Sequence, residues 1–374
     1  MDEATKQEEG RGRLEAILAC FERRGFARRE PPLLQPAGVF LDRSGEDFRG
    51  RLYLTSDASG AELCLRPEYT IPVCLDYLAS PQAGRPATVA YGGAVFRAGA
   101  PDGGEFLQAG VESFGRDDRE AADAEILASA LEAAQATGTA DFEVRIGDAG
   151  IVSGFLDRLT LPPVWRRRLA AGHARGRPLS EIFSPPGPNG GGEHAGVLAA
   201  LAKVEPAQAR RLVEDLLSIA GVAAVGGRGP SEIAERFLEQ AELAEGAGVP
   251  AEKRALAEAF FAIEGAPDAA SAALRRLAAE AGLDLGAALD CFDARSGFVA
   301  ARGLALDDMR FSTSFARHLD YYTGFVFEAR RRGSEAAVVG GGRYDRLLKT
   351  LGAKEDIPAV GAAVWVDRLQ GDAP

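Results

Sequence analysis

Cysteine and histidine are scarce in this sequence of 374 residues. The four cysteines are Cys20, Cys64, Cys74 and Cys291. The three histidines are His173, His194 and His318. No two cysteines have CxxC spacing and the histidines lie far apart, whereas a zinc site needs a tight cluster of such ligands. The sequence therefore predicts free, buried thiols and no metal site.

Long apolar runs and a surplus of positive charge are also missing. No run is long enough to cross a bilayer, and the N-terminal segment MDEATKQEEGRGR lacks the apolar core of a secretory signal. These features predict a cytoplasmic protein without a membrane partner. The 43 Lys and Arg stand against 55 Asp and Glu, a net charge of -12. Because phosphate contacts need clustered cations, this balance does not favour a nucleic-acid partner, although a local basic face remains compatible with it.

Helical and strand-like patterns alternate in the first 150 residues. Apolar residues recur at helical spacing over residues 13–24, and Gly25 follows as a typical helix end. Residues 51–66 alternate on both sides of the turn sequence DASG, which predicts a hairpin. Residues 88–115 predict a second strand–loop–strand unit, and an alanine-rich stretch over residues 119–135 predicts a helix.

The middle of the sequence is different, because helical patterns dominate from about residue 151 to residue 305. Strand-like patterns return over residues 309–322 and continue from there. We therefore predict two domains, one discontinuous (residues 10–150 and 306–370) and one mainly helical insertion (residues 151–305). The predicted fold class is α+β, with one antiparallel sheet flanked by helices. No GxGxxG stands at a strand–helix junction, and no cofactor is predicted.

Polar side chains gather on the strand-like segments. Gln108 and Glu112 are four residues apart on one predicted strand, so their side chains share a face, and Arg97 lies on the opposing arm. The same spacing predicts that Arg317 and Tyr321 share a face near the last strands. The other polar residues of this group are Glu68, Thr70 and Tyr322.

If these strands share a sheet, the group suits a small zwitterion. Carboxylates bind an ammonium, and a guanidinium or an amide binds a carboxylate. A carboxylate and a phenol together can bracket an imidazole, whose two nitrogens need separate partners. The alternative is a solvated sheet face with scattered polar residues. The run GGG at residues 340–342 lacks the Lys and Ser/Thr of a phosphate loop and instead predicts a strand-end bend or a close approach of the backbone to a ligand.

Six segments resemble one family, the class II histidyl-tRNA synthetases. They are GFARREPP (residues 25–32), LRPEYT (65–70), VFRAGAPDGGEFLQAGVESFG (95–115), RHLDYYTG (317–324), GGRYD (341–345) and AVGAAVWVDRL (359–369). The first resembles the dimer-forming class II motif, and the third and the last resemble the second and third motifs, with Arg97 and Arg368 at their arginines. Over most of residues 10–370 the sequence most resembles a non-synthetase paralogue, the regulatory subunit of ATP phosphoribosyltransferase.

Departures from the synthetase pattern favour this paralogue. The sequence stops shortly after the third motif, where a synthetase continues, so we expect no C-terminal anticodon-binding domain and no tRNA partner. Ala98 and Gly99 replace a polar pair in the second motif, and the loop that follows lacks Lys and Arg. Tyr69 and His318 stand where the synthetases have glycine.

The resemblance implies a non-catalytic regulatory subunit in the first step of histidine biosynthesis. It would activate a short-form catalytic subunit, form a dimer core within a hetero-octamer, and carry feedback inhibition by L-histidine. The implied histidine-binding residues are Glu68 and Thr70 for the ammonium, Gln108 for a nearby polar contact, Glu112 and Tyr322 for the imidazole, Tyr321 for the ring and Arg317 for the carboxylate. The implied phosphate-contacting remnants are Arg97 and Arg368.

Two other functions remain compatible with the sequence. One is a histidine-activating enzyme similar to a synthetase but without its own anticodon-binding domain, since the retained Arg317 leaves adenylation open. The other is a dimeric scaffold whose ligand site is vestigial. The docking surface for a catalytic subunit is not fixed by the sequence, and residues 151–305 are the candidate region for a regulatory contact.

Overall fold

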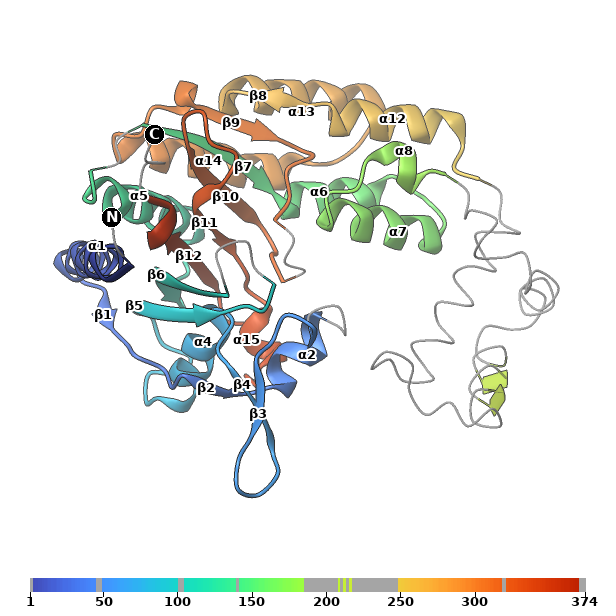
Figure 1. The fold of residues 1–374 in the computed structure, drawn as a ribbon. Coiled ribbons are helices and arrows are strands. Elements are labelled where there is room, and N and C mark those ends of the chain that lie inside the picture. Colours follow the sequence, from blue (N-terminus) through green and yellow to red (C-terminus); the bar gives the residue numbers. More distant parts are fainter. Residues whose placement is uncertain are drawn as a thin grey trace.

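The computed structural model describes residues 3–44, 49–99, 104–138, 141–184, 248–317 and 321–369, and also residues 208, 211, 212, 215 and 216. A large sheet forms the centre of the molecule, and helices lie on both of its sides (Figure 1). Residues 185–196 of the glycine-rich segment, and His318, lie outside the described residues.

Nine strands form the main sheet in the order β1-β5-β6-β12-β11-β10-β7-β9-β8. They are β1 (Ala27–Arg28), β5 (Ala87–Phe96), β6 (Glu105–Phe114), β7 (Phe142–Asp148), β8 (Glu264–Gly265), β9 (Met309–Ser312), β10 (Phe325–Arg331), β11 (Ala337–Arg343) and β12 (Ala359–Trp365). Neighbouring strands are antiparallel, apart from the parallel pairs β1–β5 and β7–β9 near the two ends. The predicted α+β sheet, built from both ends of the sequence, is confirmed.

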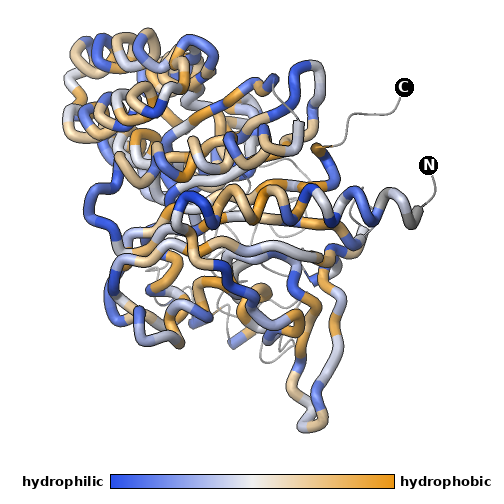
Figure 2. The backbone as a smooth tube through the Cα atoms, turned by 90° about the vertical axis from the view of Figure 1, so that its left-hand side faces the viewer, coloured by the Kyte–Doolittle hydropathy of each residue, from blue (hydrophilic) through white to orange (hydrophobic). Residues whose placement is uncertain are grey.

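Three helices cover one face of this sheet (Figure 1). They are α1 (Glu3–Arg23), α5 (Arg119–Gln135) and α14 (Gly286–Ala301). The first contacts β5 and β6, the second contacts β6, β11 and β12, and the third packs on α5. Small alanine side chains let α5 approach the sheet closely, and its bounds are those predicted. The helix predicted over residues 13–24 already begins at Glu3, and residues of both hydropathies alternate along it (Figure 2).

The opposite face of the sheet meets a second, smaller apolar cluster. It includes residues of α4 (Thr70–Ala79) and α15 (Leu347–Thr350), among them Val73, Tyr77 and Leu348. A small antiparallel sheet lies beside it, with the order β2 (Leu34–Pro36), β4 (Glu62–Leu65), β3 (Leu54–Ser56), and α2 (Gly38–Ser44) adjoins it in the sequence. The buried polar residues Gln108 and Glu112 of β6 also lie on this face, whereas helices cover the other face.

Helices dominate the described part of the region between residues 151 and 305. They are α6 (Ala149–Arg158), α7 (Pro163–Ala174), α8 (Leu179–Ile182), α12 (Ala251–Phe261), α13 (Pro267–Ala281) and α14. Strand β8 also lies in this region and extends the main sheet by pairing with β9. Most of these elements gather at one end of the sheet (Figure 1).

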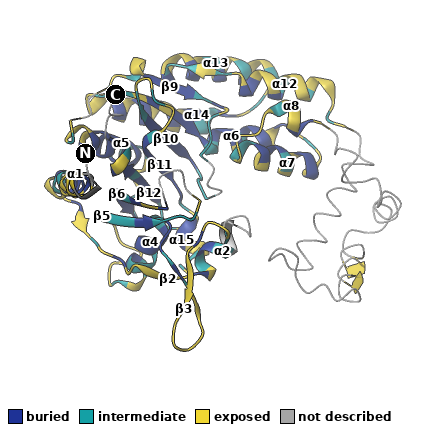
Figure 3. Cartoon of the chain, viewed as in Figure 1, coloured by how far each residue is buried: buried dark blue, intermediate teal, exposed yellow. Residues whose placement is uncertain are grey.

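The hairpin predicted over residues 51–66 is confirmed by the antiparallel pair β3–β4. Asp57 organises its turn, because its carboxylate accepts hydrogen bonds from the backbone N–H groups of Ser59 and Ala61. The hairpin projects from the body of the molecule and is largely exposed, whereas the central strands are buried (Figure 3).

Two predictions need correction. Of the segment 309–322, the structure describes residues 309–317 and 321–322, and among these only Met309–Ser312 form a strand. The chain turns at Thr313, whose hydroxyl donates toward the backbone carbonyls of Phe260 (2.7 Å) and Ile263 (3.1 Å). Arg317 therefore lies in a loop, and the period of two does not relate it to Tyr321. Of the four free cysteines, Cys291 is exposed on α14 and not buried.

Candidate functional site

The register of the central strands sets out the candidate site on the face opposite α1 and α5. Glu112 of β6 is paired with Gly361 of β12, which is paired with Gly342 of β11. Four residues back along β6, Gln108 is paired with Trp365, so Gln108 and Glu112 share one face as predicted. This face, which we call the site face, also includes Tyr91, Gly93, Gly110, Gly340 and Ala363.

Glu112 is the most deeply placed acid of the site face, with 1% of its surface exposed. The Tyr91 hydroxyl donates to its Oε1 (3.2 Å), and the Tyr344 hydroxyl donates to its Oε2. Burial raises the pKa of Glu112 to about 8, although these hydrogen bonds oppose the shift. Only glycine fits opposite the carboxylate, since a Cβ on Gly361 would stand 1.5 Å from Oε2.

Tyr91 and Tyr344 are functional candidates that sequence reasoning missed. Tyr91 lies in the predicted strand–loop–strand unit of residues 88–115 and Tyr344 lies in GGRYD, but they are 21 and 232 residues from Glu112. The register of β5 and β6 brings the Tyr91 hydroxyl to this carboxylate, and the chain just after β11 brings that of Tyr344, so no local spacing signals either contact.

Glu68 stands at the start of α4. Its two carboxylate oxygens accept hydrogen bonds from the backbone N–H groups of Thr70 (2.7 Å) and Ile71 (2.8 Å). Unpaired N–H groups at a helix N-terminus favour such an anion. Burial raises the pKa of Glu68, and these hydrogen bonds and the charge of Arg97 oppose that shift. The carboxylate keeps further lone pairs for a ligand, because each oxygen can accept more than one hydrogen bond.

Arg317 reaches the site face from the loop after β9. Its guanidinium lies over Gly340, where a Cβ would stand 1.8 Å from Nη1. Nη1 donates to the carbonyl of Phe327 (3.3 Å) and lies 4.0 Å from the Glu328 carboxylate. Nε has no hydrogen-bond partner among the described residues. A guanidinium of the same protein thus lies close to the glycine run, and the close approach of a ligand predicted there stays a prediction.

Tyr321 and Tyr322 follow Arg317 and pack against each other, with ring centroids 4.9 Å apart. The Tyr321 ring also meets the ring of Tyr344, at 5.8 Å and 77°. Burial is the main cause that raises the pKa of both phenols, and the Glu112 carboxylate adds to it. The two phenols therefore stay protonated at neutral pH and can donate hydrogen bonds.

Arg97 and Arg368 border the same face. The Arg97 Nε donates to the carbonyl of Pro67 (2.7 Å), and its pKa is lowered by burial and by the positive charges of Arg51 and Arg368. Arg368 donates from Nη1 to the carbonyl of Ala337 (3.1 Å). With these two, all nine residues singled out in the sequence lie in one connected neighbourhood.

The protonation of Glu112 should make the stability of the protein depend on pH. A glutamate in the unfolded chain has a pKa of about 4.3, whereas the folded protein holds the pKa of Glu112 at about 8. Between these values the folded state binds the additional proton, so the free energy of unfolding should fall as the pH rises. Glu112→Gln keeps the acceptor oxygen without titrating.

We expect the free energy of unfolding of the wild type to fall by at least about 1 kcal/mol more than that of Glu112→Gln when the pH is raised from about 5 to about 8. Urea unfolding of both proteins at the two pH values measures it. An equal pH dependence in both proteins would contradict the raised pKa.

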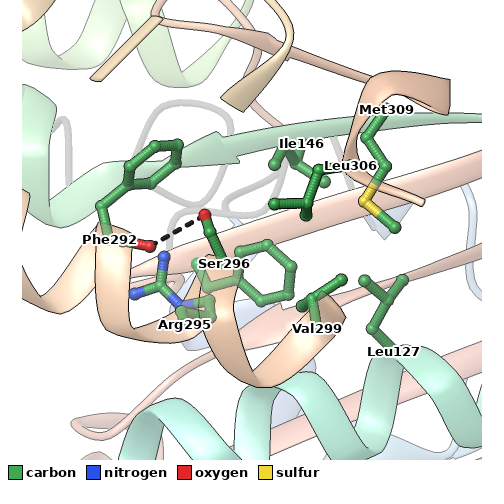
Figure 4. Close-up of a pocket in the computed structure, with 9 residues that line it drawn as sticks. Leu127, Ile146, Phe292, Arg295, Ser296, Val299, Leu306 and Met309 are labelled. Atoms are coloured by element: carbon green, nitrogen blue, oxygen red, sulfur yellow. Dashed lines mark hydrogen bonds between the residues drawn. The ribbon is translucent and has the colours of Figure 1, made fainter. Parts of the chain in front are cut away.

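Two cavities lie away from the site face. The first is small, lies under α14, and has a mainly apolar lining (Figure 4). Its lining residues are Leu127, Ile146, Phe292, Arg295, Ser296, Val299, Leu306, Met309 and Phe325. Its polar groups are satisfied, because Ser296 donates to the Phe292 carbonyl (3.0 Å) and Arg295 is paired with two aspartates. This cavity therefore offers no free polar group to a ligand.

The second cavity opens between α7, α8 and α12. His173 lies in its wall, and burial lowers the pKa of this imidazole to about 4, which leaves it neutral at pH 7. Across the residues that the structure describes, no group of three or more His, Cys, Asp or Glu side chains is placed to hold a metal ion. None of the described helices is long and apolar enough to cross a membrane.

Comparison with known proteins defines the class first. The family model for histidyl-tRNA synthetase matches residues 2–176 and 209–369. A crystal structure described as an ATP phosphoribosyltransferase regulatory subunit/histidyl-tRNA synthetase from Bacillus halodurans has the same fold, with a TM-score of 0.64 at 20% identity, over 97% of this chain and 78% of that one. The sheet and its site face thus define a class II aminoacyl-tRNA synthetase-like core.

Two curated relatives narrow the class. The ATP phosphoribosyltransferase regulatory subunit of Brucella anthropi is 40% identical over 364 residues, which cover 96% of each chain. The protein of the same name from Mesorhizobium japonicum is 42% identical over 361 residues, 95% of each chain. The chain belongs to the family of ATP phosphoribosyltransferase regulatory subunits.

Proposed function

We propose that this chain is the non-catalytic regulatory subunit of an ATP phosphoribosyltransferase and carries feedback inhibition by histidine. The observation that carries the proposal is the match to regulatory subunits along nearly the whole of both chains. The relatives' name implies a catalytic partner. We propose that this partner is a short-form catalytic subunit, that the two act in the cytoplasm in the first step of histidine biosynthesis, and that a dimer of this chain forms the core of a hetero-octamer.

The site face is the proposed histidine site. Glu68 and Thr70 would hold the ammonium, and Arg317 would face the carboxylate. The unpaired Nε of Arg317 supports this role, because it is a buried donor that a ligand carboxylate would satisfy.

The imidazole would lie between Glu112 and Tyr322, with Tyr321 along its ring. Gln108 supports the assignment in a similar way, since its Oε1 is buried without a hydrogen-bond partner in the described part of the chain. One imidazole nitrogen would donate to a carboxylate, and the other would accept from a phenol.

Inhibition requires histidine to bind one state of the complex more tightly than the other. A ligand with equal affinity for both states shifts no equilibrium, however tightly it binds. We propose that histidine on the site face favours the inactive arrangement, and that neither a metal nor tRNA takes part.

Reconstitution with a short-form catalytic subunit tests the proposal. We expect the two chains to co-purify, the catalytic subunit to gain activity, and histidine to inhibit the complex. Calorimetry of histidine with the purified chain checks the site directly. Failure to activate any short-form subunit would contradict the regulatory role.

The rival function, histidine activation, has a separate assay. It is favoured by Arg97, Arg317 and Arg368, which border one face. Histidine-dependent exchange between ATP and pyrophosphate would establish it, and we expect no such exchange. Loss of co-purification together with measurable exchange would replace the proposal by this rival.

A further inference from the structure

Trp365 ends β12 and places its indole on the site face beside Gln108. The side chain is 8% exposed. The guanidinium carbon of Arg368 lies 5.0 Å from the centre of the indole, and that of Arg317 lies 5.5 Å from it. Both distances are within the range of a cation–π contact. The indole therefore engages two of the three arginines that border the site face.

The same neighbourhood holds buried polar atoms without hydrogen-bond partners. They are the indole Nε1 of Trp365, the Oε1 of Gln108 and the Nε of Arg317, none of which has a hydrogen-bond partner among the described residues. Buried polar groups are nearly always paired. Among the described residues, the indole is therefore held by packing and by the two guanidiniums, and its Nε1 makes no hydrogen bond.

Several positions of the site face near Trp365 are small. Gly93 is paired with Gln108, and β12 otherwise presents Gly361 and Ala363 on this face. The indole of Trp365 is therefore the large side chain of β12 on this face, beside Gln108 and close to two guanidiniums. Arginine side chains in such a place suit phosphate groups, which they bind through charge and paired N–H donors.

We propose that Trp365 is a specificity-determining residue that excludes nucleotides and other phosphate-bearing ligands from the site face. Its indole lies against Arg317 and Arg368, where the phosphates or the base of a nucleoside triphosphate would make their contacts. A free amino acid still has Glu68, Glu112 and the exposed part of Arg317. The claim that an amino acid still binds here rests on the proposed histidine site. The claim that nucleotides are excluded rests on Trp365 alone.

Removal of the indole tests the exclusion. In Trp365→Gly, the two guanidiniums should become available to phosphate, and we expect ATP to bind at least about tenfold more tightly than to the wild type. Trp365→Phe is the matched control, because it keeps an aromatic ring in place and should gain little. Adding Arg368→Ala to Trp365→Gly should abolish the gain. Equilibrium dialysis with ATP measures all four proteins.

Two outcomes of the dialysis would overturn the proposal. One is wild-type protein that binds ATP as tightly as Trp365→Gly. The other is a Trp365→Gly protein with a native thermal melt that gains no affinity for ATP. Titration of the same samples with histidine keeps this test separate from that of the proposed function. The wild type can fail to bind histidine while Trp365→Gly still gains affinity for ATP.

A second measurement does not depend on the folding of Trp365→Gly. The chain has two tryptophans, so Trp165→Phe leaves Trp365 as the sole indole. We expect ATP to leave the fluorescence of that protein unchanged, because the nucleotide is kept away from the ring. A saturable change in emission with ATP would overturn the exclusion.

Discussion

Glu112→Ala is expected to remove most of the response of the complex to histidine. The buried carboxyl group is the proposed partner of one imidazole nitrogen, and leaving a buried hydrogen-bonding group without its partner costs about 1–3 kcal/mol. We therefore expect a loss of affinity of about fivefold to 150-fold. Inhibition of the reconstituted complex by histidine, and calorimetry on the isolated chain, measure this loss.

Glu105→Ala is the matched control on the same strand. Glu105 begins β6 and is exposed, so its removal should leave histidine inhibition unchanged. If Glu112→Ala also leaves inhibition unchanged while the complex assembles, the site face is not the histidine sensor. The chain would then act as a scaffold with a vestigial site.

Asp123→Ala is expected to cause the largest loss of stability. Asp123 lies on α5 with 1% of its side chain exposed, and its carboxylate joins Arg295 (2.8 Å) and Arg343 (2.7 Å). Removing one member of a buried ion pair leaves uncompensated charge and costs about 3–5 kcal/mol. Two guanidiniums would lose a partner here, although Arg295 keeps Asp148 and Arg343 keeps Asp345. Denaturant unfolding measures the cost.

Glu132→Ala is the matched control for this prediction. Glu132 lies on the same helix and pairs with Arg24, but its side chain is 52% exposed. Surface ion pairs contribute about 0–1 kcal/mol, so this variant should unfold almost as the wild type does. Similar losses in the two variants would show that the buried network does not stabilise the fold.

Local patterns predicted most individual elements correctly. The hairpin β3–β4 follows from alternation around DASG, and α5 follows from its composition, because both depend on neighbours within a few residues. The shared face of Gln108 and Glu112 follows from the period of two along a strand. Such features depend on residues that are close in the sequence and not on contacts with distant segments.

Elements that depend on remote partners were predicted poorly. Of the strand-like pattern over residues 309–322, the described residues form a strand only from Met309 to Ser312, and the next residue, Thr313, binds carbonyls of Phe260 and Ile263 from a distant segment. The link from Asp123 to Arg295 joins residues 172 apart in the sequence. No local pattern carries that information.

The sequence by itself determined the fold class, the family resemblance and the residue types of the site, since these reside in periodicity and in short motifs. Only the tertiary structure decided how the site is built. It placed Tyr91 and Tyr344 on Glu112, and Trp365 against Arg317 and Arg368. The physical reason is that strand register decides which strand residues, such as Tyr91, Glu112 and Trp365, share a face, whereas the path of the chain after the strands brings Tyr344, Arg317 and Arg368 against that face.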